Sequence, residues 1–136
     1  MATHDTLFQT SDLRLHPDGL AISVQLPWYR SLWLSAVNDV AVRLDGTDVP
    51  RRDIRFELDG RAYAVDELPE QWDVLWFLQD RADVIVPWNG PSGRDELRVE
   101  LTLELRLLYM QIAPMRYVPN RVVAEKTIDP AVLVPA

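Results

Sequence analysis

Side chains that could do chemistry are scarce in this sequence of 136 residues. It contains no cysteine, so it offers no thiol nucleophile, no disulfide and no thiolate zinc ligand. Its two histidines are His4, near the N-terminus, and His16, which precedes the turn sequence Pro17-Asp18-Gly19. Neither belongs to a His-x-His or His-Glu-x-x-His cluster, and the sequence has no glycine-rich phosphate loop. We therefore expect no catalytic residue, no metal site and no cofactor site on this chain.

Acidic residues are the remaining candidates for bond cleavage, because most glycosidases use two carboxylates that face one cleft. The acids that lie close together in this sequence are Asp66, Glu67, Glu70 and Asp73. Spacing along one loop does not establish that two carboxylates face each other across a substrate. We interpret this cluster as a solvated loop.

Two segments combine aromatic residues with arginine, and both residue types are enriched at the centres of binding surfaces. The first spans residues 27–34, and the second spans residues 109–117, where methionines add an adaptable apolar surface. The candidates for an interface or for the edge of an active site are Trp28, Tyr29, Arg30, Trp33, Arg116 and Tyr117. The same rings could instead close the end of a hydrophobic core. The sequence leaves both interpretations open.

The acidic balance of the chain disfavours several kinds of partner. The net charge is −7, and residues 62–100 carry nine acids against three arginines. Nucleic-acid affinity depends on a basic surface that neutralises phosphates, and this sequence has no basic stripe. An anionic membrane surface is disfavoured for the same reason, and no run approaches the roughly 18 apolar residues of a spanning helix. We expect a soluble cytoplasmic protein that binds neither nucleic acid nor membrane.

The elements that must position these residues follow from the hydrophobic pattern, which is strongest at residues 97–109. Apolar residues from Leu97 to Tyr109 occupy one parity, and polar residues such as Arg98, Glu100 and Arg106 occupy the other. A period of two is typical of a strand with one buried face, whereas a helix would scatter these leucines around its circumference. The pattern therefore predicts a long strand whose polar face is solvated or faces a partner.

Shorter alternating runs, separated by turn residues, repeat this pattern along the chain. The predicted strands span residues 13–15, 20–26, 40–44, 54–58, 61–65, 72–78, 82–86, 97–109 and 121–128. Asp59-Gly60 between two such runs predicts a tight hairpin, because glycine accepts the positive φ of these turns. Residues 31–38 fit either one helical turn or a bulged strand.

The number and spacing of these strands predict an all-β fold. We expect an antiparallel β-sandwich of about eight or nine strands with little or no helix. The sandwich domain is predicted at residues 13–128. An N-terminal arm at residues 1–12 precedes it, and a C-terminal tail at residues 129–136 follows it.

An ordered set of short motifs resembles the β subunits of C-glycoside deglycosidases. The motifs are Leu26-Pro27-Trp28-Tyr29-Arg30-Ser31-Leu32-Trp33-Leu34-Ser35, Val42-x-Leu44-Asp45-Gly46, Val49-Pro50, Asp53-Ile54-Arg55-Phe56, Asp59-Gly60-Arg61, Tyr63, Glu67-Leu68, Trp76 and Arg106-x-x-Tyr109. The resemblance covers about residues 13–127. The sequence departs from the family pattern at Trp28, where the family has tyrosine, at Ser31, where it has glycine, and at residues 88–93, which replace a more glycine-rich loop.

The resemblance implies a small β-sandwich subunit that pairs with a larger α subunit of TIM-barrel type. In that family the α subunit holds a divalent metal, manganese in particular, and the acid–base residues. The complex cleaves the carbon–carbon bond between a sugar and an aromatic aglycone after an oxidoreductase has made the 3-keto sugar. This chain would be a non-catalytic subunit that stabilises the barrel and lends loops to the mouth of its active site.

Two other classes of protein stay open. A stand-alone carbohydrate-binding module would also be a β-sandwich with exposed aromatic residues, and it would bind glycans as the isolated chain. A small jelly-roll enzyme would need a metal, although the usual histidines are missing, and metal analysis of the purified chain would reveal it. We rank the lyase subunit first and the binding module second.

Overall fold

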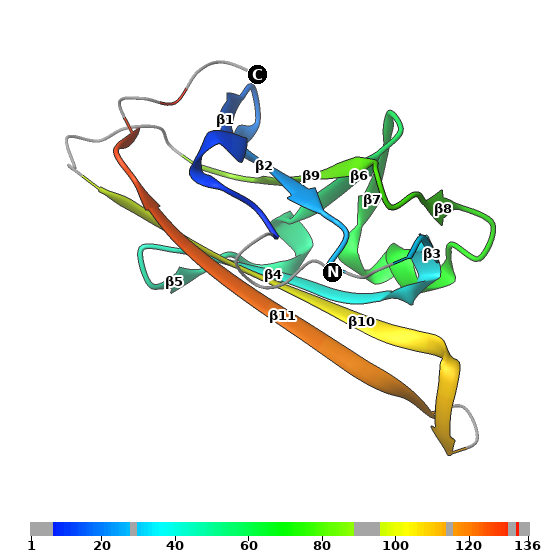
Figure 1. Ribbon diagram of the computed structural model, residues 1–136. Coiled ribbons are helices and arrows are strands. Elements are labelled where there is room, and N and C mark those ends of the chain that lie inside the picture. The colour runs from blue at the N-terminus through cyan, green and yellow to red at the C-terminus, as the bar shows by residue number, and fades with distance from the viewer. Residues whose placement is uncertain (1–6, 28–29, 89–95, 114–115, 131–132, 134–136) are drawn as a thin grey trace.

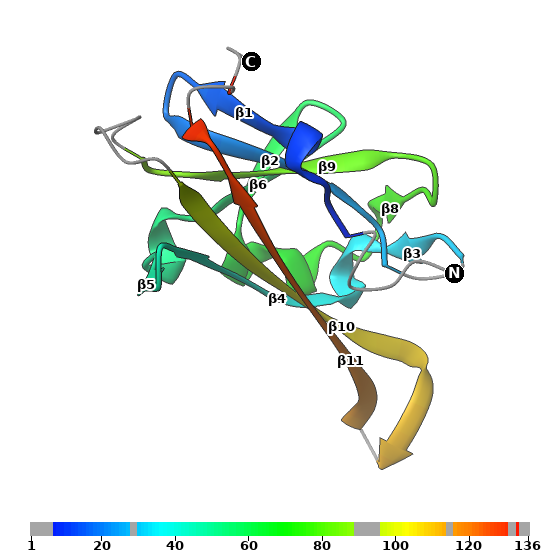
Figure 2. The ribbon, with the colours of Figure 1, turned by 60° about the vertical axis from the view of Figure 1, so that its left-hand side comes forward.

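The computed structural model describes residues 7–27, 30–88, 96–113, 116–130 and 133, and for residues 107–113 and 116–120 it describes the backbone alone. Within this part of the chain, eleven strands form two layers and a small third sheet (Figures 1 and 2). Every strand pair is antiparallel. The prediction of an all-β antiparallel fold is confirmed.

The two layers differ in how many strands they contain. The five-stranded sheet consists, in spatial order, of β1 (Leu13–His16), β2 (Gly19–Gln25), β9 (Arg81–Val86), β6 (Arg55–Leu58) and β7 (Arg61–Ala64). The four-stranded sheet consists of β11 (Arg116–Ile128), β10 (Leu97–Ala113), β4 (Val37–Leu44) and β5 (Thr47–Asp48). The third sheet pairs β3 (Leu32–Trp33) with β8 (Leu75–Trp76).

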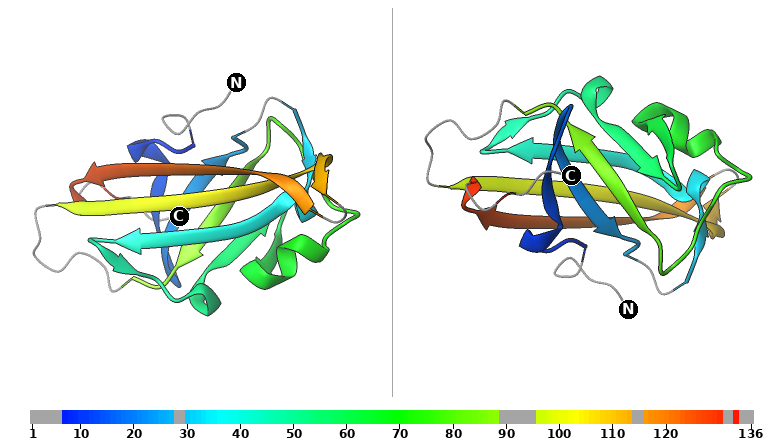
Figure 3. Two further views of the ribbon diagram at one scale, coloured as in Figure 1. Left: turned by 90° about the horizontal axis from the view of Figure 1, so that it is seen from below. Right: turned by 90° about the horizontal axis from the view of Figure 1, so that it is seen from above.

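The hydrophobic core lies between the two layers, whose strands cross when they are viewed from above or below (Figure 3). On β10, alternate residues from Leu97 to Leu105 are buried, as the period of two predicts. The facing layer contributes alternate residues of β2 and β9, such as Ile22 and Val84. Trp76 closes one end of the core, where its ring meets Phe56 edge-on with centroids 5.5 Å apart.

The Asp-Gly turns form as the sequence predicts. Asp59 and Gly60 both have positive φ and connect β6 to β7 across the pair Leu58–Arg61. Asp45 and Gly46 do the same between β4 and β5. Two consecutive residues with positive φ give the backbone twist that matches a right-twisted hairpin.

The largest departure from the predicted elements is at residues 65–80. The strand predicted at residues 72–78 shortens to the two residues of β8. Local hydrogen bonds replace the ladder: the amide of Trp72 donates to the Glu70 carbonyl, and the indole of Trp76 donates to the Asp80 carbonyl at 2.9 Å. The number of strands rises from the expected eight or nine to eleven because two further strands of two residues each, β3 and β5, were not predicted.

Helical structure in the described residues is limited to short 3-10 turns. They are η2 (Thr10–Asp12), η3 (Leu34–Ala36), η4 (Arg51–Asp53) and η5 (Val65–Glu70). At residues 31–38, the turn η3 follows β3, so the alternative of one helical turn is correct. A helix with the length and apolarity needed to cross a membrane is absent from the described residues.

Residues near both ends of the chain also belong to the core. Leu7 and Phe8 are fully buried, and the Gln25 amide donates to the Leu7 carbonyl at 2.9 Å. Leu133 is buried near the other end. The domain boundaries given above stay a prediction.

The turn between β1 and β2 provides a test of backbone packing. Gly19 has a φ of +143°, and a Cβ at this position would overlap the Val86 carbonyl oxygen and the Trp88 amide. We expect Gly19→Ala to lower the free energy of unfolding by about 3 kcal/mol, because β2 must shift against β9. Urea denaturation would measure the change. Gly60→Ala is the matched control: its Cβ would meet open space, so its cost should be about 1 kcal/mol, from positive φ alone. Equal losses of unfolding free energy in the two variants would show that the close approach of Gly19 to Val86 and Trp88 is not the cause.

Candidate partner-binding surface

The six residues singled out from the sequence lie in two places. Trp28 and Tyr29 lie outside the described residues. Arg30 is exposed just before β3, and Trp33 within β3 is 48% exposed. Arg116 and Tyr117 begin β11, where their backbones pair with Ala113 and Gln111, and their side chains lie outside the description.

Large apolar side chains are exposed where β3 meets β8. Four of the five large exposed hydrophobic residues in the described part of the chain come from β3 and from residues 72–78, the segment that contains β8. We call them the aromatic edge: Trp33, Trp72, Phe77 and Leu78. Trp72 is the most exposed of them, at 57%. Because exposed apolar surface marks sites of interaction when it is concentrated in one region, this edge is the strongest candidate for a binding surface.

Backbone hydrogen bonds hold the two segments of the aromatic edge together. The Leu34 amide donates to the Val74 carbonyl at 2.7 Å, and the Ser35 amide donates to the Gln71 carbonyl at 3.1 Å. At the other end, the Leu78 amide donates to the Ser31 hydroxyl at 2.7 Å. The apolar side chains therefore project from a fixed backbone.

Arg106 joins the aromatic edge to the long strand β10. Its Nε donates to the Ser35 carbonyl at 3.0 Å, and one terminal nitrogen donates to the Pro69 carbonyl at 2.9 Å. The guanidinium carbon also lies 5.5 Å from the centroid of the Trp72 ring, within the range of a cation–π contact. One partly buried side chain thus connects η3, η5 and Trp72.

Sequence reasoning missed Trp72, Phe77 and Leu78 because it assigned them to a strand. A strand at residues 72–78 would have placed Trp72 and Leu78 on the same face as Trp76, which is fully buried. Residues 72–78 contain neither proline nor glycine, so the sequence gives no signal that this strand would be short.

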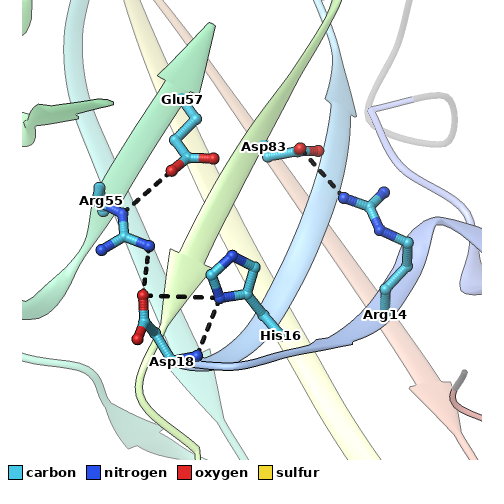
Figure 4. A network of polar contacts seen from close by, with 6 residues as sticks. All are labelled: Arg14, His16, Asp18, Arg55, Glu57 and Asp83. Carbon is cyan, nitrogen blue, oxygen red and sulfur yellow. Dashed lines mark hydrogen bonds and ion pairs between the residues drawn. The ribbon is translucent and has the colours of Figure 1, made fainter. Parts of the chain in front are cut away.

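The outer face of the five-stranded sheet has a different character, because polar side chains of the same chain cover it (Figure 4). Across the sheet, Arg14, Ala21, Ile85 and Arg55 are successive register partners. Ala21 and Ile85 point away from the core but are almost completely buried. The aliphatic stems of arginine can cover apolar surface in this way.

Acidic partners neutralise both Arg14 and Arg55. Arg14 pairs with Asp83 at 3.1 Å, and Arg55 pairs with Asp18 at 2.7 Å and with Glu57 at 3.4 Å (Figure 4). Because its charged groups already pair within the chain, this face is a poorer candidate for docking than the aromatic edge.

Of the residues considered for chemistry, His4 lies outside the described residues, and His16, Asp66 and Glu67 have structural roles. The Nδ1 atom of His16 accepts a hydrogen bond from the Asp18 amide at 3.0 Å, so this imidazole closes the β1–β2 turn. The clustered acids lie in and after η5 with exposed side chains, where Asp66 pairs with Arg51 at 2.7 Å and Glu67 accepts the Ala64 amide at 2.7 Å. Among the described residues, no three His, Asp or Glu side chains gather as metal ligands would.

Comparison with known proteins places the sequence among enzyme subunits. A family model described as C-glycoside deglycosidase beta subunit matches residues 4–109. A C-glycoside deglycosidase beta subunit of Arthrobacter globiformis is 60% identical over 129 residues, which are 94% of this chain and 98% of the relative. A 3'-dehydrocarminate deglycosidase beta subunit of Microbacterium sp is 33% identical over 96 residues, which are 70% of this chain and 71% of the relative.

The ion pair between Asp18 and Arg55 predicts a dependence of stability on acid. The hydrogen bond from Arg55 holds the pKa of Asp18 below its usual value, and the positive charge of Arg55 adds to the effect. A lowered pKa contributes stability above the usual value of about 3.9, and this contribution is lost as the pH falls through the folded-state pKa. We expect the drop in unfolding free energy between about pH 6 and about pH 2.5 to be smaller in Asp18→Asn than in the unmodified protein. Urea denaturation at both pH values would measure it, and parallel pH curves would refute it.

Removal of the Arg106 side chain tests its role as the link to the aromatic edge. We expect Arg106→Ala to lower the unfolding free energy by about 2 kcal/mol, because two carbonyl groups lose a charged donor. The matched control is Arg98→Ala, since Arg98 is an exposed residue of the same parity on β10. The control should stay within about 0.5 kcal/mol of the unmodified protein in chemical denaturation. If the two variants are equally stable, Arg106 does not hold the edge in place.

Proposed function

Because the chain belongs to the family of C-glycoside deglycosidase beta subunits, we propose that it is the non-catalytic subunit of a heteromeric deglycosidase and binds its larger partner through the aromatic edge. A beta subunit implies a partner subunit in a complex. The observation that carries the proposal is the exposure of Trp33, Trp72, Phe77 and Leu78 on a backbone that Arg106 fixes. Aromatic residues on a rigid support are the usual energetic centre of an interface.

The reaction we propose for the complex is cleavage of the carbon–carbon bond between a 3-keto sugar and an aromatic aglycone. A ketone makes the proton on the neighbouring C2 carbon acidic, so a base can remove it to give an enolate. The aryl group then leaves the adjacent carbon and takes up a proton. The name of the Microbacterium relative, a 3'-dehydrocarminate deglycosidase beta subunit, supports a substrate of the 3'-dehydro type.

We assign the catalytic residues to the partner, which we propose to be a TIM-barrel α subunit with a divalent metal, manganese in particular. Such a metal would stabilise the negative charge of the enolate oxygen. The residues of this chain support that division. Its sequence lacks cysteine, and His16 is engaged in a turn on the face opposite the core. The cytoplasm is the location that we propose for the complex.

The aromatic edge would also place this chain near the mouth of the partner's active site. A polyphenolic aglycone can stack on indole rings and on arginine planes. Trp33 and the exposed Arg30 stand at the start of this edge. The alternative of a carbohydrate-binding module uses the same exposed rings, and it requires that the isolated chain bind glycans.

Substitution of an indole ring on the aromatic edge tests the assembly. We expect Trp33→Ser to raise the dissociation constant for the cognate large subunit at least tenfold, because an interface aromatic is commonly worth about 2 kcal/mol. The unfolding midpoint of the isolated chain should change little, since about half of this side chain is solvated. Val123→Ser, which removes the fifth large exposed hydrophobic residue from another surface, should leave the dissociation constant unchanged.

Isothermal titration calorimetry with the purified large subunit would measure both dissociation constants. Unchanged binding by the Trp33 variant would remove the aromatic edge from the interface. Tight glycan binding by the isolated chain, without affinity for the large subunit, would favour the carbohydrate-binding module instead.

A further inference from the structure

The hairpin of β10 and β11 continues well past the sandwich. The pairing of β10 with β4 ends at Leu105–Val37, whereas its pairing with β11 continues to Ala113–Arg116. At about 3.3 Å per residue, the eight residues of β10 beyond Leu105 can reach about 25 Å. Figures 1 and 2 show this end of the hairpin standing clear of both layers. We call the part formed by residues 107–113 and 116–118 the hairpin extension.

The sequence pattern of β10 changes where the hairpin extension begins. Apolar and polar residues alternate over residues 97–106, but Leu107, Leu108, Tyr109 and Met110 are consecutive apolar residues. The register with β11 shifts between Leu107 and Gln111, so these residues lie at a bulge and not in a regular pleat. Because no polar residue alternates with them, the sequence marks neither face of the extension as the solvated one. Strands with this composition are usually covered on both faces.

In the described part of the chain, the hairpin extension is not covered on both faces. The core covers one face of β10 in the sandwich, and the extension projects past it as a ribbon of two strands (Figures 1 and 2). Isolated two-stranded hairpins are marginally stable in water. Over residues 107–118 the sequence also carries a single charge, that of Arg116, in a chain with a net charge of −7. This composition suits an apolar cleft more than water.

The hairpin extension starts next to the aromatic edge. Residue 107 directly follows Arg106, which binds the Ser35 and Pro69 carbonyls and lies over the Trp72 ring. Figures 1 and 3 place β3, β8 and the extension at the same end of the sandwich. A partner that covers the aromatic edge would therefore have the extension directly beside it.

We propose that the hairpin extension inserts into an apolar cleft of the large subunit and is covered by it on both faces. This proposal rests on the function proposed above and adds a second, two-sided contact to the same interface. A second copy of this chain is a poorer occupant, because among the described residues the large exposed hydrophobic side chains outside the aromatic edge reduce to Val123. A second copy would also offer the extension a hollow of about 310 Å³ on the outer face of the four-stranded sheet. Charged residues line this hollow, including Arg43, Glu100 and Arg121, so it does not suit an apolar segment.

Shortening of the hairpin tests the proposal directly. Arg106 and Pro119 are register partners, so residues 107–118 can be replaced by an Asn-Gly turn that joins them. We expect the shortened chain to keep the unfolding midpoint of the unmodified protein, because β4 pairs with β10 only up to Leu105. Its dissociation constant for the large subunit should rise at least 100-fold in calorimetry.

Point variants test whether the partner covers the whole apolar run of the extension, and they serve if the shortened chain does not fold. Tyr109→Asp and Met110→Asp each place a charge within the apolar run, and each should raise the dissociation constant at least tenfold. The matched control, Thr127→Asp, adds the same charge at an exposed position near the other end of β11 and should leave it unchanged.

The outcomes separate the two proposals. If the unmodified chain does not bind the large subunit, the proposed function fails, and the extension proposal fails with it. If the unmodified and shortened chains bind equally, only the extension proposal is overturned. A loss of binding in one aspartate variant alone overturns the insertion of the whole apolar run. A dimer of the isolated chain that becomes a monomer on shortening, measured by light scattering, would overturn it in favour of a second copy.

Discussion

The structure depends on the pleat of β10, which sends alternate side chains of one strand to opposite sides of the four-stranded sheet. From Leu97 to Leu105, the inward-facing side chains lie in the core between the two layers. The outward-facing positions can then carry charged residues. Arg106 is the last of these before the alternation of apolar and polar residues ends. Because this one strand pairs with both β4 and β11, its register fixes the position of the whole layer.

The surfaces of the molecule divide according to what the chain itself covers. On the outer face of the five-stranded sheet, Ala21 and Ile85 are buried in register between Arg14 and Arg55, whose charges pair with acids of the same chain. At the aromatic edge, the backbone is fixed by hydrogen bonds while the rings stay exposed. A rigid backbone that presents uncovered apolar groups loses little conformational entropy on association, which favours a protein interface. The contrast between these surfaces agrees with membership in a family of enzyme subunits.

Local pattern was sufficient to predict most of the strands, and it failed where non-local contacts decide the conformation. Asp59-Gly60 forms its hairpin because the turn geometry depends on those two residues and their immediate neighbours. Segment 72–78 carries the residue types of a strand, yet pairing requires a partner along its whole length. The fold supplies the partner β3 for two residues only, and most of the remaining residues, Trp72 and Phe77 among them, are exposed.

The sequence by itself determined the all-β class, the buried parity of β10 and the scarcity of side chains for catalysis, because each follows from residue type and from spacing along the chain. The tertiary structure decided which aromatic residues are exposed and how they are held. Arg106 reaches the carbonyls of Ser35 and Pro69, which are 71 and 37 positions away in the sequence. Such contacts depend on how the layers pack, since the backbone carbonyls they use are common to all residues and leave no mark in the pattern of side chains.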